Sequence, residues 1–138
     1  MEDLGISRMT LPLELNSREL ETLGCEEMEL YVYGYLPAMV SAQCIVRTTK
    51  GCTKQPEVLK MKDRTGKDLP VKNHCRFCYN TIYNPSPLSL LGQEKLIRRL
   101  APGALRLAFT LETPEQMKAV LDAFADKFLH GEEPRDPF

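Results

Sequence analysis

The sequence lacks a large net charge, a long apolar run and the short motifs that identify common hydrolases. Its 18 basic and 19 acidic residues leave a net charge of −1. The total charge therefore does not attract the chain to nucleic acid or to an anionic membrane, although a local basic patch could. No apolar run approaches the roughly 18 residues of a membrane span, so we expect no membrane partner. There is no glycine-rich phosphate loop, no G-x-S-x-G and no H-E-x-x-H, which excludes recognisable serine-hydrolase and metalloprotease patterns.

The chain also lacks the features of a secreted, disulfide-bonded protein. It begins with Met1, Glu2 and Asp3, an acidic start that no apolar segment follows, so no secretory signal is expected. Its five cysteines are an odd number, which fits poorly with a closed set of disulfides. Clustered cysteines in a reducing compartment indicate metal or redox chemistry. We therefore expect a cytoplasmic protein whose cysteines take part in such chemistry.

Apolar segments and helix start signals predict an α/β fold with a parallel sheet. One start signal lies at Asn16, with Glu19 three residues later, and another at Thr113, where Pro114 and Gln116 follow. Strands and helices alternate along the chain, which is typical of parallel sheets. The three expected core strands are residues 6–11, 28–33 and 105–109. The expected helices run from residue 16 to Gly24, over residues 92–100 and from residue 113 to His130.

A cysteine-bearing insert is expected within a single domain that spans residues 1–138. The insert covers residues 35–91, and its residues 35–56 read as irregular. Apolar residues alternate with lysines over residues 57–72 around a turn at residues 63–66, which predicts a β-hairpin. Residues 132–138 are expected to form a flexible tail.

Four of the cysteines are candidate ligands of one metal centre. Cys44, Cys52, Cys75 and Cys78 flank the expected hairpin, and the last two form a C-x-x-C pair that can direct two sulfurs to one ion. Four thiolates satisfy either a zinc ion or a [4Fe–4S] cluster, and His74 is a substitute ligand. The first pair lacks the tight spacing of a zinc ribbon. The alternative is that these are ordinary buried thiols, as is expected of the fifth cysteine, Cys25.

Two charged residues outside the insert are candidates for substrate binding. Glu14 follows the end of the first expected strand, where barrel enzymes place catalytic carboxylates; the alternative is that it favours the dipole of the helix that starts at Asn16. Arg106 lies within an apolar strand, where a buried guanidinium needs an anionic partner. That partner is either a substrate or, as the preferred interpretation, an internal carboxylate.

A series of motifs around the insert resembles the collagenase-like peptidase family U-32. The resemblance covers roughly residues 5–130 and is carried by the order of the motifs. They are Glu29-Leu30-Tyr31-Val32-Tyr33-Gly34, Met39-Val40-Ser41-Ala42-Gln43-Cys44, Lys62-Asp63-Arg64-Thr65-Gly66, Leu69-Pro70-Val71, Cys75-Arg76, Ile82-Tyr83-Asn84 and Pro87-Leu88-Ser89-Leu90-Leu91.

This resemblance implies a fold, a cofactor and a function. The family's domain resembles a (β/α) barrel, of which this chain matches the later strands and the insert, so the fold expected is a partial barrel. The remainder of the barrel or a second copy of the chain is then an expected partner. Relatives hydroxylate RNA bases or ubiquinone precursors without oxygen, and several hold an iron–sulfur cluster on four cysteines. The function expected is such hydroxylation of RNA or a small molecule; the alternatives are a collagenase-like protease and a non-catalytic zinc module.

Overall fold

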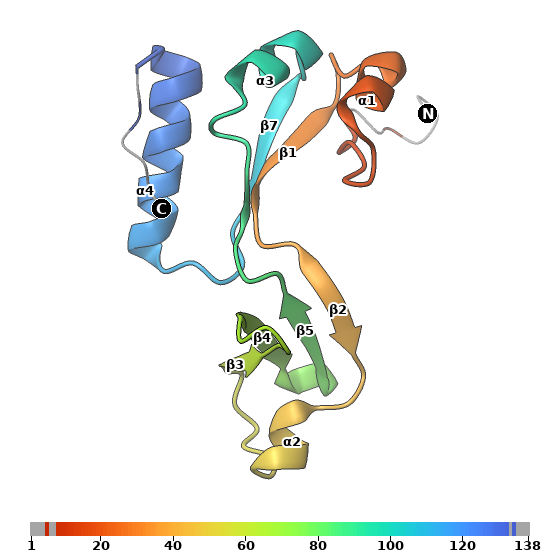
Figure 1. Ribbon diagram of the computed structural model, residues 1–138, viewed down its shortest axis with the longest axis vertical. Coiled ribbons are helices and arrows are strands. Elements are labelled where there is room, and N and C mark those ends of the chain that lie inside the picture. The colour runs from red at the N-terminus through yellow and green to blue at the C-terminus, as the bar shows by residue number, and fades with distance from the viewer. Residues whose placement is uncertain (1–4, 6–7, 133, 135–138) are drawn as a thin grey trace. The chain divides into compact units, whose positions relative to one another are not determined.

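The protein is described from a computed structural model, which describes residues 5, 8–132 and 134. The chain divides into two compact units (Figure 1). One, called here the terminal unit, is formed by Met1–Gly34 and Leu88–Phe138; the other, the cysteine unit, is Tyr35–Pro87. The expected mixed α/β class is confirmed, since the elements comprise two sheets and four α-helices. Neither sheet closes on itself.

The terminal unit contains a three-stranded sheet in the order β6-β1-β7. Strands β1 (Glu29–Gly34) and β7 (Ala104–Ala108) are parallel, as expected, whereas the short β6 (Leu88–Ser89) is antiparallel to β1. The strand predicted at residues 6–11 is wrong within its described part, where Thr10 makes only an isolated parallel bridge to Glu29. Residues 6 and 7 of that prediction lie outside the described residues.

Capping side chains determine where the helices of the terminal unit begin. The Asn16 side chain accepts hydrogen bonds from the first turn of α1 (Ser17–Leu23), and the Glu19 carboxylate accepts one from the Asn16 backbone N–H, so the capping box is confirmed. Thr113 and Gln116 make the same exchange at the start of α4 (Pro114–Ala125), which continues as a π-helix (Asp126–His130). Helix α3 (Glu94–Leu100) precedes β7. Within the described part of the chain, no helix has the length and apolarity to cross a bilayer.

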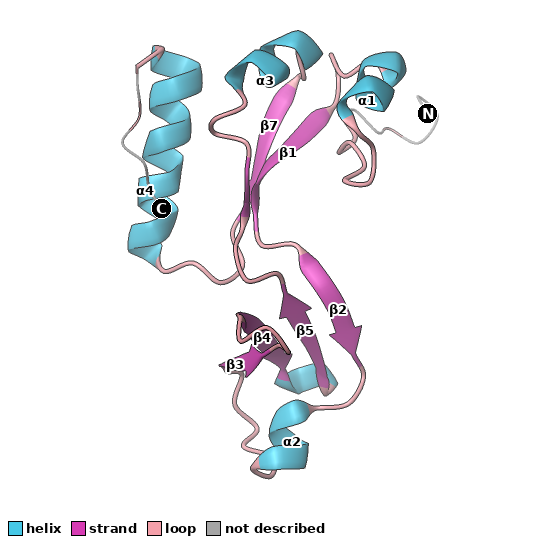
Figure 2. Cartoon of the chain, viewed as in Figure 1, coloured by secondary structure: helices cyan, strands magenta, loops and turns pink. Residues whose placement is uncertain are grey.

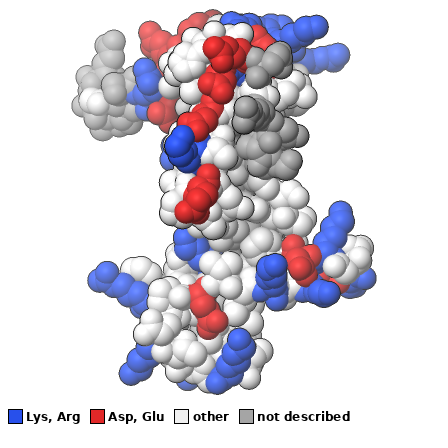
Figure 3. Space-filling view, turned by 90° about the vertical axis from the view of Figure 1, so that its left-hand side faces the viewer, with Lys and Arg blue, Asp and Glu red and all other residues white. Residues whose placement is uncertain are grey.

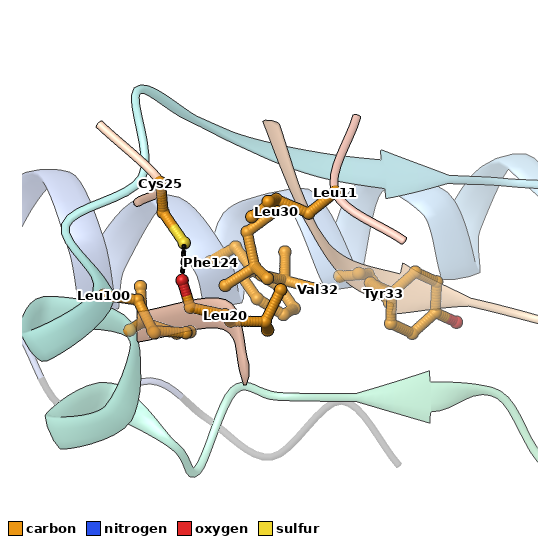
Figure 4. Packing of buried hydrophobic residues seen from close by; sticks show 10 residues of the cluster. Leu11, Leu20, Cys25, Leu30, Val32, Tyr33, Leu100 and Phe124 are labelled. Atoms are coloured by element: carbon orange, nitrogen blue, oxygen red, sulfur yellow. Dashed lines mark hydrogen bonds between the residues drawn. The ribbon is translucent and has the colours of Figure 1, made fainter. Parts of the chain in front are cut away.

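The core of the terminal unit lies where these helices pack against β1. Figure 4 shows Val32 and Tyr33 of β1 beside Phe124 of α4, with Leu20 and Leu100 from the shorter helices nearby. The full buried cluster is Leu11, Leu20, Cys25, Leu30, Val32, Tyr33, Ile97, Leu100, Val120 and Phe124. At the end of β1, Gly34 has φ +146, and an added Cβ would collide with Tyr31 Oη and the Ala108 carbonyl oxygen. Only glycine therefore suits this position, since strands β1 and β7 approach closely there.

The cysteine unit is built on a four-stranded antiparallel sheet in the order β2-β5-β4-β3. The predicted hairpin is confirmed as β3 (Val58–Lys62) and β4 (Asp68–His74), and Figure 2 shows the sheet beside helix α2 (Ile45–Thr49). The prediction of irregular structure over residues 35–56 is wrong, because β2 (Pro37–Ser41) and α2 lie there. β5 (Tyr79–Tyr83) was likewise not expected.

The apolar core of the cysteine unit is small. Its buried apolar side chains are Val46, Val71, Ile82 and Tyr83. Strand β3 and most of β2 are exposed along their length. Small units rarely gain enough stability from the burial of apolar surface alone, and many use a metal or disulfides in addition. The four cysteines of this unit are free thiols and form no disulfide.

Candidate metal centre in the cysteine unit

The four candidate ligands come from three local structures. Cys44 is the N-cap of α2, Cys52 lies in the loop that leads to β3, Cys75 begins a 3-10 turn (Cys75–Phe77) after β4, and Cys78 ends that turn. Cys44 and Cys75 are half-buried, whereas Cys52 and Cys78 are exposed. The sheet thus brings cysteines that are up to 34 positions apart in sequence into one region of the unit.

Cys75 is the centre of this group. Partial burial raises the pKa of the Cys75 thiol above its ordinary value, and the neighbouring sulfurs of Cys52, Cys78 and Cys44 raise the pKa further. A hydrogen bond between the Cys52 and Cys75 side chains acts in the same direction. All three other cysteines therefore lie close enough to Cys75 to influence its ionisation.

The C-x-x-C pair is held on a tight turn. The Cys78 backbone N–H donates to the Cys75 carbonyl oxygen at 3.4 Å, and Cys78 has a left-handed backbone with φ +55. Non-glycine residues in this conformation carry strain, and such strain is concentrated at functional sites. The turn keeps the two sulfurs of the pair on the same short segment, which is the local geometry a metal knuckle needs.

Hydrogen bonds to Cys44 and to the chain next to it determine the position of this cysteine. Its thiol donates to Oδ1 of the buried Asn73 at 3.7 Å, and its sulfur accepts from the Arg47 backbone N–H at 3.5 Å. Asn73 pairs across the sheet with Asn80, which is fully buried and donates to the Gln43 carbonyl oxygen at 2.6 Å. Both asparagines therefore hold the chain entering α2 against the sheet, which fixes the position of Cys44.

The thiols lie in one region of the unit, but their side chains are not arranged as a complete metal-binding site. Among residues 5, 8–132 and 134, no three His, Cys, Asp or Glu side chains are arranged as a group that could hold a metal ion. His74, the expected substitute ligand, makes a hydrogen bond through Nε2 to Thr81 Oγ1 at 3.2 Å and stacks on Tyr79 with 4.3 Å between the ring centroids. The donor chemistry of four thiols nevertheless fits zinc or an iron–sulfur cluster.

Two hollows border the cysteines; three cations line the first and one lines the second. A hollow of about 620 Å³ is lined by three of the cysteines together with Lys54, Lys72 and Arg76. A second hollow of about 350 Å³ places Arg47 beside Cys44 and Cys78. No Asp or Glu of the described chain is among the residues that line either hollow. The surroundings of the thiols are therefore positively charged.

The positive charge belongs to the cysteine unit as a whole. Residues 35–87 contain nine basic and three acidic residues, a formal charge of +6, whereas the rest of the chain contains nine basic and sixteen acidic residues, a formal charge of −7. In Figure 3, Lys and Arg side chains project from the cysteine unit, and Asp and Glu are prominent on the terminal unit. The net charge of −1 conceals this division. Sequence reasoning missed it, although a count over the insert alone would have found it.

The two substrate-binding candidates lie in the terminal unit. Glu14 is exposed in a turn before α1. Arg106 is exposed rather than buried, which corrects the expectation from its apolar strand. Its guanidinium donates to Thr10 Oγ1 at 2.8 Å and lies 3.4 Å from Glu29 Oε2, so it has the internal carboxylate partner that was the preferred interpretation. Cys25 is buried in the core, as expected, and donates to the Leu20 carbonyl oxygen at 3.3 Å.

Comparison with known proteins does not assign the chain to a family. No protein-family model, no curated protein and no solved structure matches it. The resemblance to family U-32 therefore rests on the motifs quoted above, and the function has to be argued from the cysteine unit itself.

Proposed function

We propose that the cysteine unit holds a thiolate-bound metal centre, a [4Fe–4S] cluster in preference to zinc, and that this centre serves the oxygen-independent hydroxylation of RNA. The observation that carries the proposal is that Cys52, Cys75 and Cys78 line one hollow of the unit, and that Cys44 lines a second hollow together with Cys78. These four cysteines come from three local structures of one small unit. Redox or metal chemistry is the common use of such a cluster.

The stability of the unit supports a bound metal. Only four apolar side chains of the described unit are buried, and a core of this size rarely stabilises a small unit without a metal or disulfides. Metal binding adds directly to folding free energy when the site does not exist in the unfolded chain. A centre bound by four cysteines would connect α2, the loop before β3 and the turn before β5.

The spacing of the ligands favours a cluster over zinc. Structural zinc sites usually draw on two knuckles with short spacing. Here only Cys75 and Cys78 form such a knuckle, because helix α2 separates Cys44 from Cys52. When bound, an iron–sulfur cluster supplies one-electron redox chemistry. The chain would contribute the four thiolates, and the half-buried Cys44 and Cys75 would shield one side of the centre from water.

The charge of the unit favours RNA over a small neutral substrate. Lys54, Lys72 and Arg76 line the hollow that contains three of the cysteines, and Arg47 lines the other. Cations of this kind neutralise backbone phosphates and provide most of the sequence-independent affinity for nucleic acid. The hollows would admit a nucleotide, since ligand sites usually measure about 300–1,000 Å³.

The terminal unit is proposed to be a part of a (β/α) barrel. Parallel strands β1 and β7, with α4 following β7, have the connectivity of successive barrel segments. An apolar hollow of about 550 Å³ lies among α3, β7 and α4. The remainder of a barrel, or a second copy of the chain, would cover this apolar surface.

The metal centre is tested by purifying the full chain without oxygen and measuring its visible spectrum, iron and acid-labile sulfide. We expect a brown protein with about four irons and four sulfides per chain. Cys52→Ser should lose them, and Cys25→Ser, the matched control in the other unit, should retain them. A colourless protein with one zinc would replace the cluster by a structural zinc site. If the unsubstituted protein purified in this way contained neither iron nor zinc, the proposal would be overturned.

The RNA part is tested separately, on the same preparation, by the anisotropy of a fluorescein-labelled single-stranded RNA. We expect binding that weakens by about 50-fold between 50 and 200 mM salt, because four cations on a single strand give a salt slope of about −2.8. Lys54→Glu/Arg76→Glu should abolish this binding. Arg8→Glu/Lys95→Glu changes two exposed cations of the terminal unit and should have little effect. Equal losses in both double variants would show that the net charge alone, and not the surroundings of the cysteines, is responsible.

A further inference from the structure

Phe77 is the most conspicuous side chain of the cysteine unit that packing does not explain. It is 68% exposed although it is a large aromatic residue. It belongs to the 3-10 turn between Cys75 and Cys78, and the left-handed Cys78 and the Cys78–Cys75 backbone hydrogen bond hold this turn in place. Its position beside the cysteines is therefore set by the same turn that positions the C-x-x-C pair.

The exposed ring is part of an ordered aromatic and cationic group. The Arg76 guanidinium carbon lies 5.5 Å from the Phe77 ring centroid. Tyr79 lies 6.4 Å from Phe77 between centroids at an angle of 33°, and His74 stacks on Tyr79. Such a set presents flat rings together with positive charge, a combination by which proteins hold single-stranded nucleic acid.

The ring also faces a space that can accept a nucleotide. Phe77 lines the hollow of about 620 Å³ together with Lys54, Lys72 and Arg76. The cations suit a phosphate, and a planar ring suits a base, because every base has a π-face. A base inside a duplex is already stacked on both sides, so only an unpaired base could use the ring.

We propose that Phe77 and Arg76 form a stacking subsite for an unpaired nucleobase beside the cysteine cluster. This inference rests on the proposed function, in that it names how RNA would be held at the metal centre. It adds that single-stranded RNA, and not duplex RNA, is the form recognised.

The absence of tryptophan from the sequence allows a direct test. Phe77→Trp introduces the sole tryptophan of the chain at the subsite, in the zinc-loaded full-length protein, so that no iron quenches its emission. We expect single-stranded RNA to quench this fluorescence, because the base stacks on the indole. Inorganic polyphosphate, which offers phosphates without bases, should bind without quenching. Equal quenching by polyphosphate and RNA would overturn stacking.

Binding measured by anisotropy with the unsubstituted protein separates the two proposals. Phe77→Ala should weaken binding of single-stranded RNA by about 5- to 100-fold, the range for one lost base–aromatic stack, and should change duplex binding little. Val40→Ala, which truncates another exposed apolar side chain of the same unit, is the matched control and should leave both affinities unchanged. Binding by the unsubstituted chain that Phe77→Ala does not weaken would overturn the subsite alone. Failure of the unsubstituted chain to bind RNA would overturn the RNA function and the subsite with it.

Discussion

At the scale of single residues, the five cysteines separate into two kinds by their surroundings. Cys25 is 1% exposed and lies in the apolar core of the terminal unit (Figure 4), where burial raises the pKa of its thiol and the neighbouring carboxylates of Glu26 and Glu21 raise it further. Cys52 is exposed in a loop and contacts Cys75. Cys25 therefore belongs to the apolar core, whereas the contribution of Cys52 to stability would come through the proposed metal centre.

Removal of each thiol should show this difference. Cys25→Ala leaves a small void and removes the hydrogen bond to Leu20, so it should cost about 1–2 kcal/mol of unfolding free energy. The cost should be the same with and without bound metal. Cys52→Ala should lower the melting temperature of the metal-loaded protein alone, because its side chain contributes through the metal.

Thermal unfolding of both variants, in metal-loaded form and after chelation, measures the two effects. A Cys52→Ala loss that persists undiminished after chelation would mean that the thiol contributes by packing, and would count against its assignment as a ligand.

At the scale of elements, the hairpin shows that a short segment of sequence can determine the turn that it forms. The turn between β3 and β4 is fixed by Asp63, whose Oδ1 accepts from the Thr65 backbone N–H at 2.7 Å and from the Lys67 backbone N–H at 2.9 Å. Hydrogen bonds from the Thr65 hydroxyl and from these backbone groups lower the pKa of Asp63. The ionised carboxylate is therefore the form that stabilises the turn.

This pKa predicts a pH dependence of the hairpin. A lowered pKa in the folded state means that the stabilisation is present above the ordinary aspartate pKa, near about 4, and is lost as the pH falls through the lowered value. Amide exchange at Thr65 and Lys67 should accelerate, relative to the intrinsic rate, as the pH falls through this window. Asp63→Ala should accelerate it already at neutral pH, whereas Asp68→Ala should not. Exchange that is insensitive to Asp63 would show that the strand pairing alone forms the turn.

Elements with strong local signals were predicted, and those determined by tertiary contacts were not. The capping residues Asn16 and Thr113 predicted the starts of α1 and α4, because a cap accepts hydrogen bonds from the backbone N–H groups of the adjacent first turn. Strand β5 was not predicted because it buries Asn80 and Thr81, polar residues that interrupt the alternation of apolar residues expected of a strand. Strand β2 begins at Pro37 and is largely exposed, as an edge strand can be.

At the scale of the whole molecule, the terminal unit exposes apolar side chains around its hollow. Leu129 is 79% exposed and Leu121 is 47% exposed, and both line the hollow among α3, β7 and α4. β7 is also an edge strand of the described sheet. Apolar patches next to unpaired strand edges favour association.

We therefore expect the chain to self-associate or to be poorly soluble at micromolar concentrations. Leu129→Lys should shift it toward the monomer, because a charge would then have to be buried in the contact. Val40→Lys, at an exposed position of the cysteine unit, is the control and should leave the association unchanged. Size-exclusion chromatography with light scattering measures this. Elution of the unsubstituted chain as a single monomeric species would contradict this expectation.

The sequence by itself determined the α/β class, the helix starts, the hairpin and the four candidate cysteines, because caps, turns and alternation act over a few residues. It could not show that Cys52, Cys75 and Cys78 line one hollow and that Cys44 lines a second with Cys78, since that depends on β2, β5 and the buried pair Asn73 and Asn80. The total charge of −1 concealed the basic unit, although a count over the expected insert, residues 35–91, separates +6 from −7 without the structure. Long-range strand pairing decided the arrangement of the cysteines, and with it the site on which the proposed function rests.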